Sequence, residues 1–90
     1  MSKWNLIGQV GNVIKKDNFY IINIAENKYK YNKESKKWEK DSTVWFNCIS
    51  DFEPKVSKSD RVIAEGIFIP SFLPNLPFSM KIEHIGVIQK

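Results

Sequence analysis

Phe19–Ile49, with the sequence FYIINIAENKYKYNKESKKWEKDSTVWFNCI, decides the fold of this chain of 90 residues. Apolar and polar residues alternate at both ends of the stretch, which is typical of half-buried β-strands. One predicted strand is Phe19–Tyr31 and another is Thr43–Ile49. Because successive side chains of a strand point to opposite faces, we expect Cys48 toward the core and Trp45 on the outer face.

A basic segment, Lys28–Lys40, joins these two strands. It holds six lysines and two glutamates, so it carries the whole net charge of +4, and the rest of the chain is neutral overall. Tyr29, Tyr31 and Trp38 are interspersed among the lysines, and Asn32–Ser35 is the expected tip of the hairpin. Lysines neutralise phosphates and aromatic rings stack on unpaired bases, so the segment indicates a binder of single-stranded nucleic acid.

Three further strands are predicted, over Trp4–Ile14, Arg61–Ile69 and Phe78–Ile88. Gly8 and Gly11 in the first of these indicate a bend or bulge, or the close approach of another backbone. A short polar turn, Lys15–Asn18, makes a hairpin with the following strand. No long window has a helical period, and at most one helical turn is expected near Glu53–Ser59.

Five short strands without a substantial helix predict one all-β domain over residues 1–90. The count and length fit a five-stranded oligonucleotide-binding (OB) fold barrel, with a long basic hairpin between strands 2 and 3. A closed SH3-like barrel is the structural alternative.

The composition excludes several classes of protein. The apolar runs are too short to span a membrane, and we expect neither a membrane span nor a signal peptide. Cys48 is the single cysteine, which favours a reducing, cytoplasmic setting, and His84 is the single histidine. Neither a metal-ligand cluster nor a catalytic set is present in the sequence pattern, so we expect no enzyme activity, no metal and no cofactor.

Four segments resemble the bacterial single-stranded DNA-binding protein family: LIGQVG (Leu6–Gly11), INIA (Ile22–Ala25), TVWFNCI (Thr43–Ile49) and RVIAEGI (Arg61–Ile67). The four segments follow the family's order and spacing, and together they span nearly the whole chain. The resemblance implies an OB fold, binding of single-stranded DNA, and a homodimer or homotetramer formed partly through the first strand. It also implies that Trp45 stacks on a base.

The departures from that family predict a minimal relative. The connection between Trp45 and Gly66 is short, so the helix that the family places there is expected to be trimmed or lost. We also expect no acidic C-terminal tail. A phage, plasmid or conjugative-element version, or a primosomal replication protein of the same fold, fits this pattern.

The other candidate rings each have an alternative role. Tyr31 lies at the spacing where the family carries a second stacking residue, and Tyr29 shares its face of the strand, with Lys28 and Lys30 opposite. Trp38 either contacts DNA or packs across the hairpin onto these tyrosines. Phe72 is a stacking candidate by resemblance, whereas its apolar loop, Pro70–Phe78, could instead cover an open barrel end or contact a subunit or partner.

The candidate phosphate ligands are lysines of the basic segment: Lys28, Lys30, Lys33, Lys36 and Lys37. The alternative for them is a solvated loop. We therefore predict largely sequence-independent single-stranded DNA binding in replication, recombination or mobile-element transfer. The alternatives are a protein-interaction module that docks a replication or mobile-element partner through Pro70–Phe78, and an RNA binder.

Overall fold

The computed structural model describes residues 2–71 and 77–89, which form five strands. They are β1 (Lys3–Lys15), β2 (Tyr20–Asn32), β3 (Lys37–Ser50), β4 (Arg61–Pro70) and β5 (Phe78–Gln89). All five predicted strands are present. The largest difference is at the start of β3, which lies at Lys37 instead of Thr43 because the return half of the basic segment is paired with β2 throughout.

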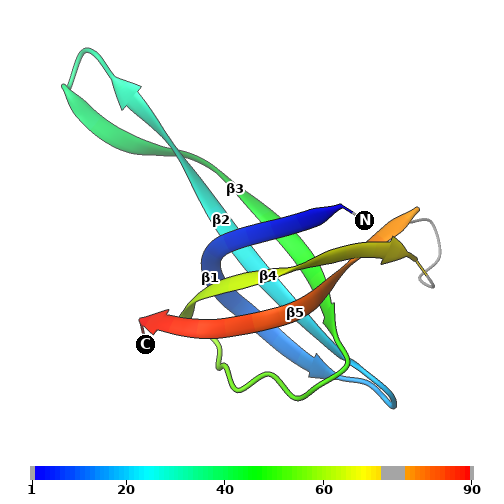
Figure 1. The fold of residues 1–90 in the computed structure, drawn as a ribbon. Coiled ribbons are helices and arrows are strands. Elements are labelled where there is room, and N and C mark those ends of the chain that lie inside the picture. The colour runs from blue at the N-terminus through cyan, green and yellow to red at the C-terminus, as the bar shows by residue number, and fades with distance from the viewer. Residues whose placement is uncertain (1, 72–76, 90) are drawn as a thin grey trace.

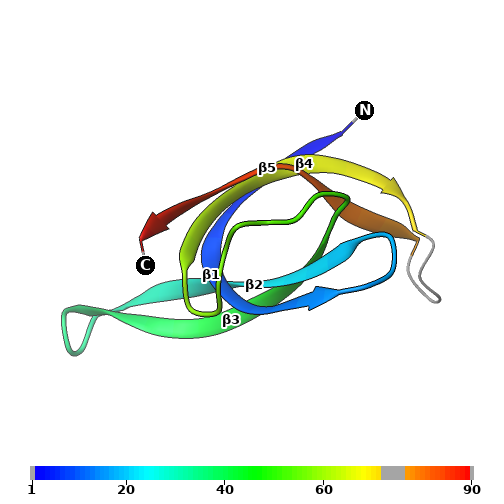
Figure 2. The same ribbon diagram turned by 90° about the horizontal axis from the view of Figure 1, so that it is seen from below.

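The strands close into a barrel in the order β1-β2-β3-β5-β4 (Figures 1 and 2). β1 pairs antiparallel with β2 along one part of its length and with β4 along the other. A short parallel contact between β3 and β5, Cys48 with Met80 and Ile49 with Lys81, completes the closure. This arrangement is that of an OB barrel, so the predicted fold is confirmed against the SH3-like alternative.

The barrel interior is apolar. Its buried residues are Trp4, Leu6, Val10, Ile22, Ile24, Cys48, Val62, Ala64 and Ile82. Each fully buried isoleucine contributes about 1.5–3 kcal/mol of burial free energy. Burial also raises the pKa of the Cys48 thiol to about 12, so this thiol stays protonated at neutral pH.

The two glycines of β1 serve the two purposes expected of them. At Gly8 a Cβ would collide with the carbonyl oxygen of Ala25, so another backbone approaches closely there. At Gly11 the pairing with β2 shifts register between Val10 and Asn12, which marks a bulge. Together they let β1 bend from its pairing with β2 to its pairing with β4.

The connection between β3 and β4 contains no helix, which agrees with the expectation of at most one helical turn near Glu53–Ser59. The connection instead runs across one end of the barrel, where Val56 packs against the core (Figure 2). It is held to the bulge of β1 by two backbone hydrogen bonds, from Ser59 N to Val10 O (2.8 Å) and from Val10 N to Asp60 O (2.9 Å). Nowhere in the described ranges is there a helix long and apolar enough to cross a membrane.

The basic segment Lys28–Lys40 extends beyond the barrel as a two-stranded projection, which we call the arm (upper left in Figure 1). The described chain measures 50 × 29 × 22 Å, with a radius of gyration of 14.7 Å. A compact domain of this length would have about 12 Å. The arm is therefore a protruding hairpin without a core of its own.

Candidate nucleic-acid interface

Trp45 lies on the outer face of the barrel, as the alternation predicted. It is paired with Ala25 on β2 and remains 59% exposed. Its ring reaches across β2 to β1, where a Cβ on Gly11 would come within 2.5 Å of Trp45 Cζ3. The ring is thus supported by the sheet on one side, and its exposed part is available to stack on a base.

A row of three asparagines lies beside this ring, one on each of three adjacent strands. Asn12 pairs with Asn23, and Asn23 pairs with Asn47 and donates a hydrogen bond from Nδ2 to Asn47 Oδ1. Asn12 and Asn23 line an open hollow of about 400 Å³ together with Trp45 and Lys58. Amide groups both donate and accept hydrogen bonds, so this row suits the edges of bases.

Three aromatic residues lie on the arm: Tyr31 and Trp38 form a pair, and Tyr29 stands apart from them. Tyr31 is directly opposite Trp38, and their ring centroids are 5.5 Å apart at an interplanar angle of 66°. The contact across the hairpin, which was the alternative to DNA binding for Trp38, is present, and 70% of Trp38 remains exposed, so its contact with DNA stays a prediction. Tyr29 is 60% exposed. The ring contact therefore stabilises the arm and leaves the aromatic surface open.

A bulge in β3 puts these rings on the same face as Trp45. Trp38 lies an odd number of residues before Trp45, so strict alternation would turn it to the opposite face. The register shifts where Lys28 pairs with Ser42 and Tyr29 pairs with Lys40, which leaves Asp41 as the extra residue. Since paired residues share a face, the rings of the arm continue the outer face of the barrel.

The pairing of β2 with β3 in the arm modifies the predicted separation of rings and charges. Lys30 pairs with Glu39, which places it on the face away from the tyrosines, as expected. Lys40, in contrast, pairs with Tyr29 and so lies on the ring face. Lys40 was not among the predicted phosphate ligands, although it shares the face of the rings.

The predicted phosphate ligands, Lys28, Lys30, Lys33, Lys36 and Lys37, are all exposed. In the described part of the chain, the ion pair found is Lys81–Asp51, and it lies outside the arm. Glu39 accepts hydrogen bonds from Asn32 Nδ2 (3.2 Å) and Ser35 Oγ (3.1 Å) instead of pairing with a lysine. The lysines of the arm are therefore free to meet an external anion.

The tip of the arm lies one residue later than predicted. The turn spans residues 33–36 and is closed by a hydrogen bond from Lys36 N to Asn32 O (2.8 Å). Asn32 Oδ1 also accepts from Glu34 N (2.9 Å), and Lys36 has a positive φ of 58°. These local bonds fix the backbone of the tip, where the lysines are exposed.

Phe72 lies outside the described residues, and so does most of the Pro70–Phe78 loop. At the described ends of the loop, Ser79 Oγ donates to Ser71 Oγ (3.0 Å) and Phe78 is exposed. The stacking role of Phe72 and the alternative roles of the loop remain predictions.

Sequence reasoning missed two groups of polar residues on the outer face. Asn23 and Asn47 could have been found, because alternation already put Asn47 beside Trp45. Arg61 and Gln9 could not, since they become neighbours only when β4 pairs with β1 to close the barrel.

The outer face of this OB barrel therefore carries the exposed ring of Trp45. The Tyr31–Trp38 pair lies on the same face, and the arm adds lysines that form no ion pair within the described ranges. No protein-family model matches the sequence, and no curated protein matches it. Solved structures do share the fold. One is a small single-stranded DNA-binding protein from Streptomyces coelicolor, with a TM-score of 0.70 and 14% identity over 96% of this chain and 91% of that chain.

Two further structures have the same architecture. One is the SSB of Plasmodium falciparum in complex with single-stranded DNA, with a TM-score of 0.61 and 14% identity over 100% of this chain and 95% of that one. The other is PriB from Ralstonia solanacearum, with a TM-score of 0.58 and 6% identity over 99% of both chains. At these identities the likeness establishes the OB fold.

Proposed function

We propose that this protein binds single-stranded DNA without enzymatic activity and with little sequence preference. The observation that carries the proposal is the position of Trp45, exposed on the outer face and supported from below at Gly11. The Tyr31–Trp38 pair lies on the same face, so bases of one strand can stack on both places. Ring faces accept any base, which accounts for sequence tolerance.

The arm supplies attraction in this proposal. Its unpaired lysines neutralise phosphates and release counterions, while the rings provide the short-range contacts. Truncating a stacking ring costs about 1–3 kcal/mol per base. We therefore assign affinity to the rings and salt sensitivity to the arm.

The structural neighbours support this class of ligand. Two of them are described as a single-stranded DNA-binding protein and as an SSB in complex with single-stranded DNA. By extension, we place the function in DNA replication, recombination or mobile-element transfer.

The test is the binding of fluorescein-labelled oligo-dT, followed by anisotropy across a range of salt concentrations. With about four phosphates neutralised, the slope of log K against log salt should be near −3. Unlabelled duplex DNA should compete poorly, and oligo-U should report whether RNA is bound as well. Absence of binding, or binding that does not depend on salt, would contradict the proposal.

We also propose that the protein assembles as a homodimer or homotetramer. Ile63 on β4 and Ile88 on β5 are each about half exposed, on strands that pair with one another. Exposed apolar surface of this kind is typical of an interface. Sedimentation equilibrium would measure the assembly, and a monomer at all concentrations would refute it.

A further inference from the structure

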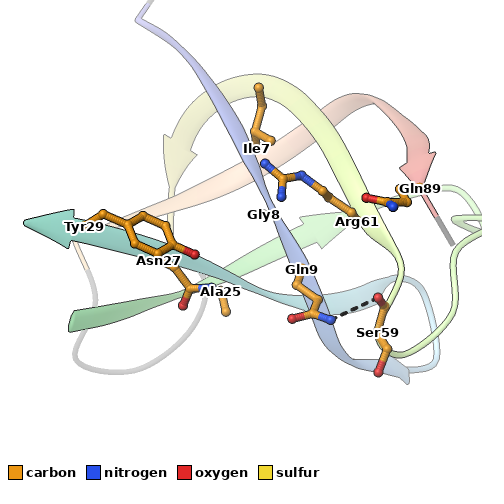
Figure 3. Close-up of a pocket in the computed structure, with 9 residues that line it drawn as sticks. All are labelled: Ile7, Gly8, Gln9, Ala25, Asn27, Tyr29, Ser59, Arg61 and Gln89. Carbon is orange, nitrogen blue, oxygen red and sulfur yellow. Dashed lines mark hydrogen bonds between the residues drawn. The ribbon is translucent and has the colours of Figure 1, made fainter. Parts of the chain in front are cut away.

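A second polar hollow lies where the arm leaves the barrel (Figure 3). The pairing of β1 with β2 reaches its end at Gln9 and Ala25, and on the other side Gln9 pairs with Arg61 of β4. Beyond Ala25, β2 continues into the arm while β1 continues along β4. The strands diverge and leave a hollow of about 290 Å³, which we call the fork pocket.

The floor of the fork pocket is built from small residues. Gly8 and Ala25 both line it, and at Gly8 a Cβ would meet the Ala25 carbonyl. The close approach of the two backbones thus permits no larger side chain at Gly8. The hollow is a consequence of how β1 and β2 pack.

The walls of the fork pocket carry groups that suit a nucleotide. Arg61 extends from β4 over β1, and Tyr29 and Asn27 line the β2 side (Figure 3). Gln9 is oriented by a hydrogen bond from its Nε2 to Ser59 O (3.2 Å), and Asn27 Oδ1 accepts from Thr43 Oγ1 (2.8 Å). The amide nitrogen of Asn27 is left to donate.

The charge of the fork pocket is positive and unopposed. Its lining includes no acidic residue, and in the described ranges Arg61 forms no ion pair. Arg61 is the single arginine of the chain. A guanidinium presents parallel N–H donors that match two oxygens of a phosphate, which an ammonium group does not.

We propose that the fork pocket binds one nucleotide of a single DNA strand, with its phosphate on Arg61 and its base beside Tyr29. The inference rests on the proposed function and adds a site that lies apart from the Trp45 platform. Arg61, Gln9, Ala25 and Trp45 form one row across four adjacent strands. At about 4.8 Å per strand, the row spans roughly 14 Å, so one strand of DNA can follow it across the barrel.

The test compares Arg61→Gln and Arg61→Lys with Lys55→Gln, which removes one exposed positive charge from the β3–β4 connection, away from the fork pocket. Oligo-dT affinity is measured by anisotropy at several salt concentrations. Arg61→Gln should bind about tenfold more weakly, with a salt slope reduced in magnitude by about 0.7, the value of one phosphate contact. Arg61→Lys should keep the slope and lose part of the affinity, and Lys55→Gln should match the wild type.

A double variant tests whether Arg61 and Tyr29 hold the same nucleotide. If they do, Arg61→Gln combined with Tyr29→Leu should lose less affinity than the product of the two single losses. Thermal unfolding of each variant checks that the barrel is intact. Equal affinities and slopes for Arg61→Gln and Lys55→Gln would overturn the fork pocket while leaving the proposed function standing. A wild-type protein that does not bind oligo-dT would overturn both.

Discussion

The barrel and the arm of this protein are held together by different forces. In the barrel, alternating strands bury side chains such as Ile22 and Ile24 completely. In the arm, the same two strands continue with no residue buried, and Tyr31 and Trp38 make an edge-to-face ring contact. The arm nevertheless carries the whole net charge of the chain.

This difference separates stability from binding. Burial in the barrel provides the folding free energy and positions Trp45, whereas the arm contains no buried residue. A bulge at Asp41 connects the two regions, because it keeps the rings of both on one face. Changes to buried residues of the barrel should therefore lower stability, whereas changes to the lysines of the arm should alter the salt dependence of binding and leave the barrel folded.

The largest effect is expected for Ile24→Ala in the core of the barrel. Removing a fully buried isoleucine side chain costs about 2–5 kcal/mol of unfolding free energy. Ile14→Ala removes the same atoms from an exposed position of β1 and should cost less than about 1 kcal/mol. Urea denaturation of both variants measures the contrast, and equal losses would show that burial in the barrel does not dominate stability.

Lysines at the tip of the arm should control the salt dependence of binding. Changing Lys33, Lys36 and Lys37 together to glutamine should reduce the slope with oligo-dT from near −3 to near −1, since each phosphate contact contributes about 0.7. The control changes three lysines outside the arm, Lys3, Lys16 and Lys55, and should leave the slope unaltered. If both triple variants lower the slope equally, the charge acts through the whole protein and the arm has no special role.

The contact between Tyr31 and Trp38 should stabilise the arm but not the barrel. Trp38→Ala should lower the unfolding free energy by at most about 0.5–1.5 kcal/mol, the value of an edge-to-face ring contact. Proteolysis of the arm should accelerate, while denaturation of the barrel should shift little. A loss comparable to that of Ile24→Ala would mean that arm and barrel unfold as one unit.

Gly11→Ala should have the smallest effect, confined to binding. The added methyl group displaces the ring of Trp45 and should weaken oligo-dT binding a few-fold, with the salt slope preserved. Gly86→Ala is the matched control, because a Cβ on Gly86 has nothing within 4 Å. Identical affinities for the two variants would contradict a supporting role for Gly11.

Much of this could be predicted from the sequence, because alternation is a local signal. The period of two predicted the faces of Cys48 and Trp45, and the turn residues separated the five strands. The paired start of β3 at Lys37 was missed, since a run of charged residues gives no apolar alternation. The position of Trp38 depends on the bulge at Asp41, which pairing with β2 imposes.

The fork pocket was beyond sequence reasoning for a related reason. Arg61 and Gln9 are far apart in the chain, and no pattern in either strand indicates that they become neighbours. Their contact follows from barrel closure, which results from all five strands packing around one core. A site made of residues far apart in the sequence can be recognised only once the three-dimensional structure is known.

Trp45 as a base-stacking platform is tested by a titration of intrinsic tryptophan fluorescence with oligo-dT at low and high salt. The wild-type protein should be strongly quenched at low salt and less so at high salt. Trp4 is buried and donates to Ile67 O (2.9 Å), so it should contribute a constant background. In Trp45→Ala the part of the quenching that comes from Trp45 should disappear, leaving that of the exposed Trp38, and affinity should fall about 5- to 150-fold, corresponding to 1–3 kcal/mol. Quenching and affinity equal to those of the wild type would contradict the assignment of Trp45 as the main contact.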